Sequence, residues 1–224
     1  MRTPHKQRLF TGSPGPASRP ISREGTYDRS VFLNLAYGRS SERFLIAYVA
    51  GTTALGLVPV LALDRSDSGR RLDHIQRMLH ACAYSLHDLQ NVGAARWNMI
   101  LELSMAIGTN EGHRWLVLDS DYHRAVNALS DLNGTDISEH GGTPLGVLGA
   151  LLNIFAHRNG ALTTRALERI YKQLLKRSSS VRRSEGAKSL FERRVFRRLV
   201  TEATILTQQS PLAGSPEPGK TGAS

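Results

Sequence analysis

The feature that most constrains this fold is an alternation of short apolar runs with longer segments of helical periodicity. The apolar runs occupy residues 31–35, 57–63, 83–89 and 114–119. Runs this short are typical of strands buried on both faces, as in parallel sheets. The alternation therefore predicts an α/β fold, flavodoxin-like or Rossmann-like. Its sheet is expected to be mostly parallel, with four to five strands and with helices on both faces.

Helices are expected between the strands and after the last one. Their expected spans are 40–55, 68–82, 97–108, 121–131, 143–157, 163–177 and 187–207. Ser40 or Ser41 can cap the first of them, and Thr163 or Thr164 the sixth. Pro59 lacks the donor that a central strand needs, so the second strand is expected at a sheet edge or at a bulge.

Residues 44–63 form a run of twenty residues without a charge, which is long enough to cross a bilayer. Gly51, Gly56 and Pro59 interrupt this run. We therefore expect a helix followed by a strand in this region, and no membrane span.

Both ends of the 224-residue chain are rich in proline, glycine and serine and lack apolar periodicity. Residues 1–28 and 208–224 are therefore expected to be disordered tails. Between them, the pattern predicts an α/β domain over 29–157 and a basic helical extension over 158–207.

Positive charge is concentrated in that extension. The chain has 29 lysine and arginine residues against 19 acidic ones, and thirteen of the basic residues against three acidic ones lie in 157–198. Such a segment attracts nucleic acid through a Coulomb term that is independent of base sequence. We expect a weak, salt-sensitive contact through 158–198, or else a solvated helical face or a surface that docks on the mildly acidic central domain.

The use of cysteine excludes several classes of protein. Cys82 is the only cysteine, so an intrachain disulfide and a cysteine-rich zinc site are excluded. Cys82 itself is expected to be a small buried side chain. The sequence contains no metal-binding motif, and no cofactor is expected. The first twenty residues lack the apolar segment of a secretory signal, which favours a cytoplasmic location.

Three polar residues lie at the expected carboxyl ends of strands. Asn34 ends the first strand, and His87 and Asp88 end the third. Ligands of parallel α/β sheets bind beyond the carboxyl ends, where the strand order reverses. With the order 2-1-3-4-5, that crevice lies between the first and third strands. These residues are candidate ligand contacts, although His87 can instead be a structural histidine bonded to a backbone carbonyl.

Glu102 lies in an otherwise apolar helical segment. Asn98 precedes it by four residues, so both share one helix face. A carboxylate in such surroundings is paired, exposed on the surface of an amphipathic helix, or functional with a raised pKa.

The segment YSLHDLQNVGAARWNMILELSMAIG combines a strand that ends in aspartate, a loop, and Asn-x-x-x-Glu-Leu on a helix. This pattern resembles nucleoside 2-deoxyribosyltransferase-like and TIR-like proteins. The segments VFLNLAYG and HRWLVLDSDYH resemble further parts of one prokaryotic branch of that group. The resemblance spans about 31–142, so it covers most of the α/β domain.

The resemblance implies a hydrolase or transferase that acts on the N-glycosidic bond of a nucleotide, with NAD as the leading candidate. Glu102 matches the helix glutamate that attacks or stabilises the anomeric carbon in catalytic relatives. Asp88 matches a residue that orients the ribose or the base. Asp64, Asp67 and Arg71, after the second strand, are expected to cover the site or bind a phosphate. Substrate contacts are expected from Asn34, His87 and Asn98. Relatives act in prokaryotic defence and often assemble, which implies an effector that forms a homo-oligomer.

The chain departs from the branch pattern at three places. Residues 35–38 replace a proline and an acidic residue, Ile100 replaces a proline, and Ser104 replaces a glycine. These departures leave open a second function, a nucleotide-binding sensor or signalling module without turnover. A third is a nucleic-acid-associated protein that uses the basic helices.

The remaining candidates have simpler explanations. Trp97 and Trp115 are expected in the core. Asp131, Asp136 and His140 fall in a polar segment that turn chemistry explains. Apolar residues of the extension follow helical spacing and are expected to pack on the α/β domain or on a second subunit.

Overall fold

A five-stranded parallel sheet forms the centre of the molecule. The computed structural model describes residues 24–63, 71–90, 97–109, 112–121, 136–158 and 160–210. The strands are β1 (Ser30–Asn34), β2 (Val58–Val60), β3 (Tyr84–Asp88), β4 (Arg114–Asp119) and β5 (Ile137–Glu139). Their order is β2-β1-β3-β4-β5, and every neighbouring pair is parallel. The predicted fold class and strand order are confirmed.

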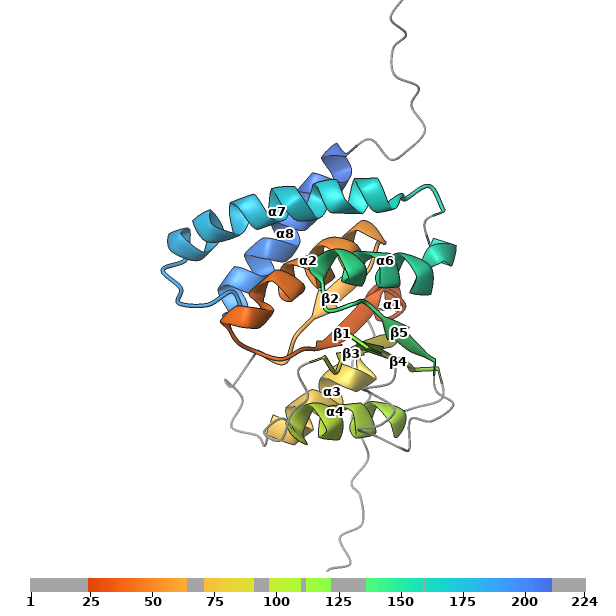
Figure 1. Cartoon of the computed structure of the whole chain (residues 1–224). Coiled ribbons are helices and arrows are strands. Elements are labelled where there is room, and N and C mark those ends of the chain that lie inside the picture. Colours follow the sequence, from red (N-terminus) through yellow and green to blue (C-terminus); the bar gives the residue numbers. More distant parts are fainter. Residues whose placement is uncertain are drawn as a thin grey trace, which may run out of the picture.

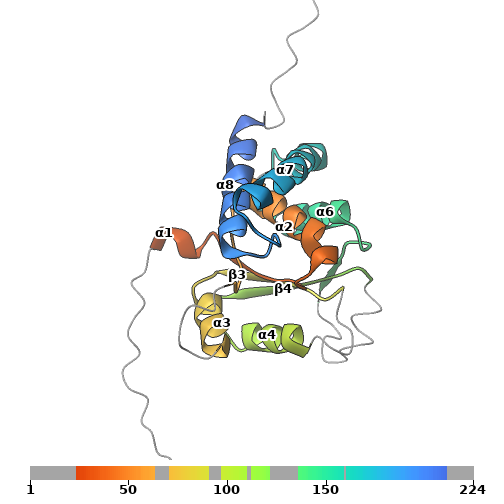
Figure 2. The ribbon, with the colours of Figure 1, turned by 90° about the vertical axis from the view of Figure 1, so that its left-hand side faces the viewer.

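The helices form layers on both sides of this sheet (Figures 1 and 2). Helices α3 (Arg71–His80) and α4 (Trp97–Ile107) cover one face. The other face is covered by α2 (Glu42–Ala54) and α6 (Pro144–Ile154), and α7 (Thr164–Ser184) and α8 (Arg193–Gln209) form a further layer outside α2. Short helical turns complete the set: α1 (Glu24–Tyr27), η1 (Arg39–Ser41) and η3 (Ala156–Arg158).

Helix α2 is the centre of the larger hydrophobic core. It contacts α6, α7 and α8, and most of its side chains are buried. Gly51 makes the close packing on α6 feasible, because a Cβ atom there would lie 2.6 Å from Cδ1 of Leu151. Close helix packing of this kind buries α2 on nearly all sides, which accounts for the long run of uncharged residues.

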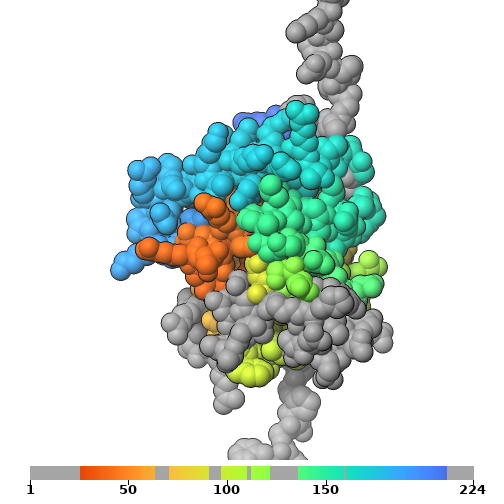
Figure 3. Space-filling model, in the orientation of Figure 1, coloured from red at the N-terminus to blue at the C-terminus, as the bar shows by residue number. Residues whose placement is uncertain are grey.

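The C-terminal helices pack on α2. Leu167, Ile170, Leu174, Val195 and Leu199 are completely buried in the shared core. Of the two predicted alternatives, packing on the α/β domain is therefore the one observed for these apolar faces. The same faces are not available to a second subunit. The connection between α7 and α8 lies beside the start of α2 (Figure 3).

A carboxylate fixes that connection. One oxygen of Glu42 accepts hydrogen bonds from the backbone N–H of Leu190 (3.0 Å) and from Oγ of Ser189 (3.3 Å), and the other lies 3.7 Å from Arg182. The C-terminal helices are therefore joined to the sheet-bearing part of the molecule by polar contacts as well as by the core.

Several local predictions are confirmed. The run 44–63 divides into α2 and the edge strand β2, which contains Pro59. None of the helices in the described ranges is both long and apolar enough to cross a membrane. The side chain of Thr163 caps α7 as predicted, by accepting from the N–H group of Ala166. Ser41 is the N-cap residue of α2, but its side chain makes no capping hydrogen bond.

Other predictions were wrong in their boundaries. Residues 137–139, expected in a loop, form β5. Helix α7 continues beyond the predicted end to Ser184. Helix α8 begins only at Arg193, and residues 187–192, predicted to be helical, are not. The expected tails overlap with α1 and with the last turn of α8. The rest of both tails, the start expected for the second helix and most of the helix expected at 121–131 lie outside the described residues.

Candidate functional site

A pocket of about 240 Å³ lies at the carboxyl ends of the strands. Its walls come from the residues after β1, from the start of α3 and from the first turns of α4. This is the place where the strand order reverses between β1 and β3, as expected for ligand sites in sheets of this type. The lining residues are Asn34, Leu35, Ala36, Tyr37, Arg71, Asn98, Met99 and Glu102.

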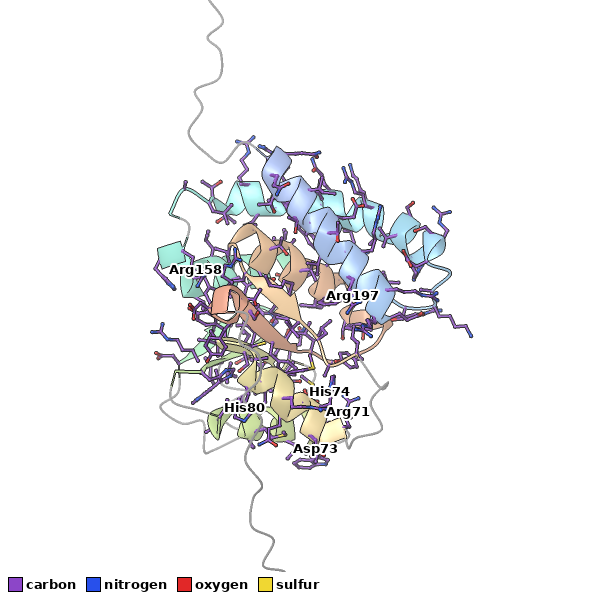
Figure 4. The ribbon with its side chains drawn as sticks, turned by 180° about the vertical axis from the view of Figure 1, so that it is seen from behind. Arg71, Asp73, His74, His80, Arg158 and Arg197 are labelled. Carbon is purple, nitrogen blue, oxygen red and sulfur yellow. The ribbon has the colours of Figure 1, made fainter. Side chains whose placement is uncertain are left out.

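Glu102 is the acidic group of the pocket. Helix α4 holds it on the inner side, and the residue is only 7% exposed. Arg71 lies at the start of α3 (Figure 4). Its guanidinium is 3.6 Å from Oε1 of Glu102. Burial raises the pKa of Glu102, while Arg71 opposes this shift by favouring the ionised form. Glu102 is thus a buried, paired carboxylate, and the alternative of a solvated surface glutamate is wrong.

Two further residues define the walls beside Glu102. Asn98 lines the same pocket one helical turn earlier, as the spacing predicted. Tyr37 lines the opposite side, and its ring packs against that of Phe191 with centroids 4.9 Å apart. Burial and the Glu102 carboxylate raise the pKa of Tyr37, so its hydroxyl stays protonated. The segment between α7 and α8 therefore supports one wall of the pocket.

Asn34 connects the pocket to a buried polar network. Its Nδ2 atom lies 2.9 Å from Nδ1 of His87 and donates to the carbonyl of Met99, also at 2.9 Å. The network continues from Nε2 of His87 to Oγ of Ser85 (2.9 Å), then to Nε2 of His113 (2.9 Å). It ends where Nδ1 of His113 meets the carbonyl of Cys82 at 2.7 Å.

Strand geometry explains this network. Asn34 and His87 are register partners on β1 and β3, and Ser85 and His87 are two residues apart. Side chains with these relations point to the same face of a sheet. Burial lowers the pKa of His87 to about 3 and also lowers that of His113, so both are neutral at pH 7. His87 is completely buried and lies behind Asn34, outside the pocket wall.

Asp88 lies on the other face of the sheet. Its carboxylate accepts from the hydroxyl of Tyr48 on α2 (2.9 Å) and from the backbone N–H of Gln90 (3.0 Å). Nε2 of His140 is 3.4 Å from Oδ1. Successive residues of a strand point to opposite faces, so β3 cannot direct both His87 and Asp88 towards α4. Asp88 does not line the pocket, and its described contacts are structural.

The structure thus brings together four of the predicted site residues. Asn34, Arg71, Asn98 and Glu102 share one pocket, whereas His87 and Asp88 lie outside its walls. Asp64 and Asp67 lie outside the described residues.

Some contributions were not recognised in the sequence. Tyr37 follows Asn34 closely enough to have been included, because residues just after a strand line the same crevice. His140 was assigned to a polar loop, yet it is buried beside Asp88. Trp97 was expected in the core and is 71% exposed, at the first residue of α4. Trp115 is half-buried and packs against the cores, as expected.

No group of three histidine, cysteine, aspartate or glutamate side chains suited to a metal occurs within the described ranges. Cys82 is buried, and burial raises the pKa of its thiol to about 12, so it is a small apolar side chain as expected.

Comparison of the chain with protein-family models, with curated proteins and with solved structures found no match.

Proposed function

We propose that the pocket binds a nucleotide and that Glu102 acts in cleavage of its N-glycosidic bond, by hydrolysis or by transfer of the sugar. The observation that supports this most is the buried Glu102 carboxylate at the switch point of the sheet. Burial of a carboxylate costs free energy because the group loses its hydration, so carboxylates are rarely buried unless they are paired. The resemblance of Asn-x-x-x-Glu-Leu on α4 to deoxyribosyltransferase-like and TIR-like proteins adds the type of reaction.

The chemistry follows from the charge that develops on the sugar. As the bond between the anomeric carbon and the base nitrogen breaks, the base leaves with the bonding electron pair and the sugar becomes oxocarbenium-like. A fixed carboxylate beside that carbon stabilises the positive charge or bonds to it. Water or an acceptor hydroxyl then adds to the carbon and releases a proton. Arg71 keeps Glu102 in the ionised form that this role needs.

The size of the pocket limits what it encloses. A volume of about 240 Å³ is below the range of roughly 300–1,000 Å³ found for pockets that enclose drug-sized ligands. It accommodates the sugar and part of the base, so the rest of a dinucleotide such as NAD would extend past Arg71 into solvent. An effector role in prokaryotic defence is part of the same proposal and rests on the resemblance alone.

The test is release of free base from NAD and from a panel of nucleosides, nucleotides and their deoxy forms, followed by chromatography. We expect release of nicotinamide or of a nucleobase by the wild-type protein and no release by Glu102→Gln. Glu168→Gln, a change of the same kind at an ion-paired glutamate on α7, is the matched control and should keep full activity. Equal release by Glu102→Gln would refute the proposal. Saturable binding of an unchanged nucleotide would favour the sensor function.

The arginines of α8 favour a second, independent activity. A hollow of about 390 Å³ is lined by Arg193, Arg194, Arg197 and Arg198 together with Glu185 and Thr201. Arg197 is exposed on α8 and makes no ion pair with any described residue (Figure 4). Four guanidinium groups around one hollow suit the phosphates of a nucleic acid.

Salt dependence tests this second activity. Binding of duplex DNA and single-stranded RNA should weaken by about tenfold or more between 50 and 200 mM salt. Arg197→Ala should weaken it further, whereas Lys172→Ala, which removes an ion-paired cation from α7, should have a smaller effect. Absence of binding at the lower salt concentration would exclude this activity.

A further inference from the structure

We infer that the buried network behind the pocket fixes the amide of Asn34 with its oxygen towards the ligand, so that the pocket selects a nucleotide with free sugar hydroxyls. The choice of a nucleotide rests on the proposed function. The orientation of the amide does not, because it follows from hydrogen-bond donors and acceptors alone.

The orientation is set at the far end of the network. The carbonyl of Cys82 can only accept, so Nδ1 of His113 must carry the proton that it receives. Nε2 of the neutral His113 is then an acceptor, and the hydroxyl of Ser85 donates to it. Ser85 has already used its only proton, so its oxygen accepts from Nε2–H of His87. Nδ1 of His87 is left as an acceptor, which requires a donor from Asn34.

The backbone of α4 independently requires a hydrogen-bond donor from Asn34. The carbonyl of Met99 can only accept, and it lies 2.9 Å from the same atom of Asn34. The two hydrogens of Nδ2 are therefore both used, one by His87 and one by Met99. Reversing the amide would place its oxygen against a carbonyl oxygen and a ring lone pair at once.

Protonation of His87 is incompatible with this arrangement. A proton on Nδ1 would face the N–H of Asn34, so two donors would meet in a site without water-accessible surface. The low pKa of His87 agrees with this geometry. The network therefore holds one direction throughout the neutral pH range.

The consequence is that Asn34 and Glu102 each present an acceptor to the pocket, with the cation of Arg71 at one edge. The amide of Asn98 and the hydroxyl of Tyr37 are the other polar groups of the lining. No described residue donates to Oδ1 of Asn34, so Oδ1 is the polar atom that Asn34 offers to the pocket. Glu102 is a second acceptor. Arg71, which is 53% exposed on its side chain, is the cation. This pattern suits sugar hydroxyls that donate to Asn34 and Glu102, with a phosphate near Arg71. It disfavours a sugar that lacks these hydroxyls.

The first test measures the network in the free protein. Long-range proton–nitrogen NMR correlations report which ring nitrogen of each histidine carries the proton. We expect His113 as the Nδ1–H form at pH 7, and His87 as the Nε2–H form from pH 7 down to at least pH 5. The opposite form for either histidine would overturn the inference, whatever the protein catalyses.

The second test measures selectivity. Glu102→Gln is titrated with AMP, GMP, CMP, UMP and nicotinamide mononucleotide, and the tightest ligand is compared with its 2′,3′-dideoxy form. Loss of the donor leaves a buried acceptor unpaired, so the dideoxy form should bind about tenfold more weakly or worse. Equal binding of both forms, or no binding of any of the five, would overturn the inferred selectivity. Base release by the wild-type protein, absent in Glu102→Gln, would leave the proposed function standing alongside either result, so the two failures are distinguishable.

Discussion

Two glycines of α6 provide a matched pair of positions for a test of how closely this helix approaches the backbone of His140. Gly146 and Gly149 lie in the same helix, three residues apart. A Cβ atom at Gly146 would overlap the backbone carbonyl of His140 and lie 2.7 Å from its carbonyl carbon. A Cβ atom at Gly149 would have no heavy atom within 4 Å. Alanine at the two positions therefore tests one substitution in two environments.

The expected effects have opposite signs. In a helix interior, alanine is more favourable than glycine by roughly 0.5–1 kcal/mol, and Gly149→Ala should gain about this amount. At Gly146 the overlap is with main chain, and the backbone of His140 is held by its N–H bond to the carbonyl of Asp119 (2.9 Å). Overpacking of this kind costs about 1–3 kcal/mol, more than the helix gain. The helix gain is common to both variants, so they should differ by the overpacking cost, about 1–3 kcal/mol.

Urea and thermal unfolding measure this difference. For a chain of this size the difference corresponds to a separation of the two melting temperatures of roughly 2–12 °C, with Gly149→Ala above the wild type and Gly146→Ala below it. Equal stabilisation by both substitutions would refute the close approach of His140 to α6.

Three further predictions concern the site. Ser85→Ala removes the hydroxyl between His87 and His113 and leaves two buried ring nitrogens unpaired. Urea unfolding should therefore show a free energy of unfolding lower by about 2 kcal/mol or more. The control Ser30→Ala removes only one hydrogen bond to a backbone carbonyl and should lower it by about 1 kcal/mol or less. Glu102→Gln should unfold at the same or a higher temperature than the wild type at pH 7, because burial raises the pKa of Glu102 and its charge therefore costs stability above that pKa. This difference should shrink as the pH falls below the ordinary glutamate value, and a variant that is less stable at pH 7 would contradict it. Urea titrations across pH should also show a loss of wild-type stability from about pH 6.5 towards pH 3, at about 1.4 kcal/mol per pH unit for His87, because its lowered pKa means that the unfolded chain takes up the proton first. The lowered pKa of His113 adds a loss of the same sign. Unchanged stability over that range would contradict neutral, buried histidines.

The strands β1 to β4 were predictable because each lies in a short stretch rich in apolar residues between helical segments, although β3 also carries Ser85, His87 and Asp88 and β2 is only partly buried. Strand β5 was not, since its three residues contain one apolar side chain and none is fully buried. It forms because β4 offers its edge, with Val117 and Leu118 opposite Ile137 and Ser138. Pairing partners that are distant in sequence determine such a strand, and periodicity within it carries no signal.

The candidate site was predictable in part for a similar reason. Glu102 and Asn98 share a helix face, and Asn34 lies at a strand end, so spacing alone places them near one crevice. The assignment of Asp88 to the same crevice overlooked the alternation of side chains along β3. The network behind Asn34 depends on His113, whose contact with Ser85 needs the register between β3 and β4. Sequence spacing does not provide that register.

Support for the pocket comes from both ends of the chain. Tyr37 follows β1, and the Phe191 ring that packs on it belongs to the connection between α7 and α8. The ion pair and hydrogen bonds of Glu42 hold that connection in place. The C-terminal helices are therefore part of the structure that shapes the pocket, in addition to presenting their arginines to solvent.

The most direct test of the proposed role of Glu102 is to measure the rate of base release and the dissociation constant for the same nucleotide, in the wild type and in Glu102→Gln. A group that acts on the transition state should leave binding within about threefold and lower the rate by at least about a thousandfold. A rate that falls only in proportion to the affinity would show that Glu102 binds the nucleotide without taking part in cleavage of the bond.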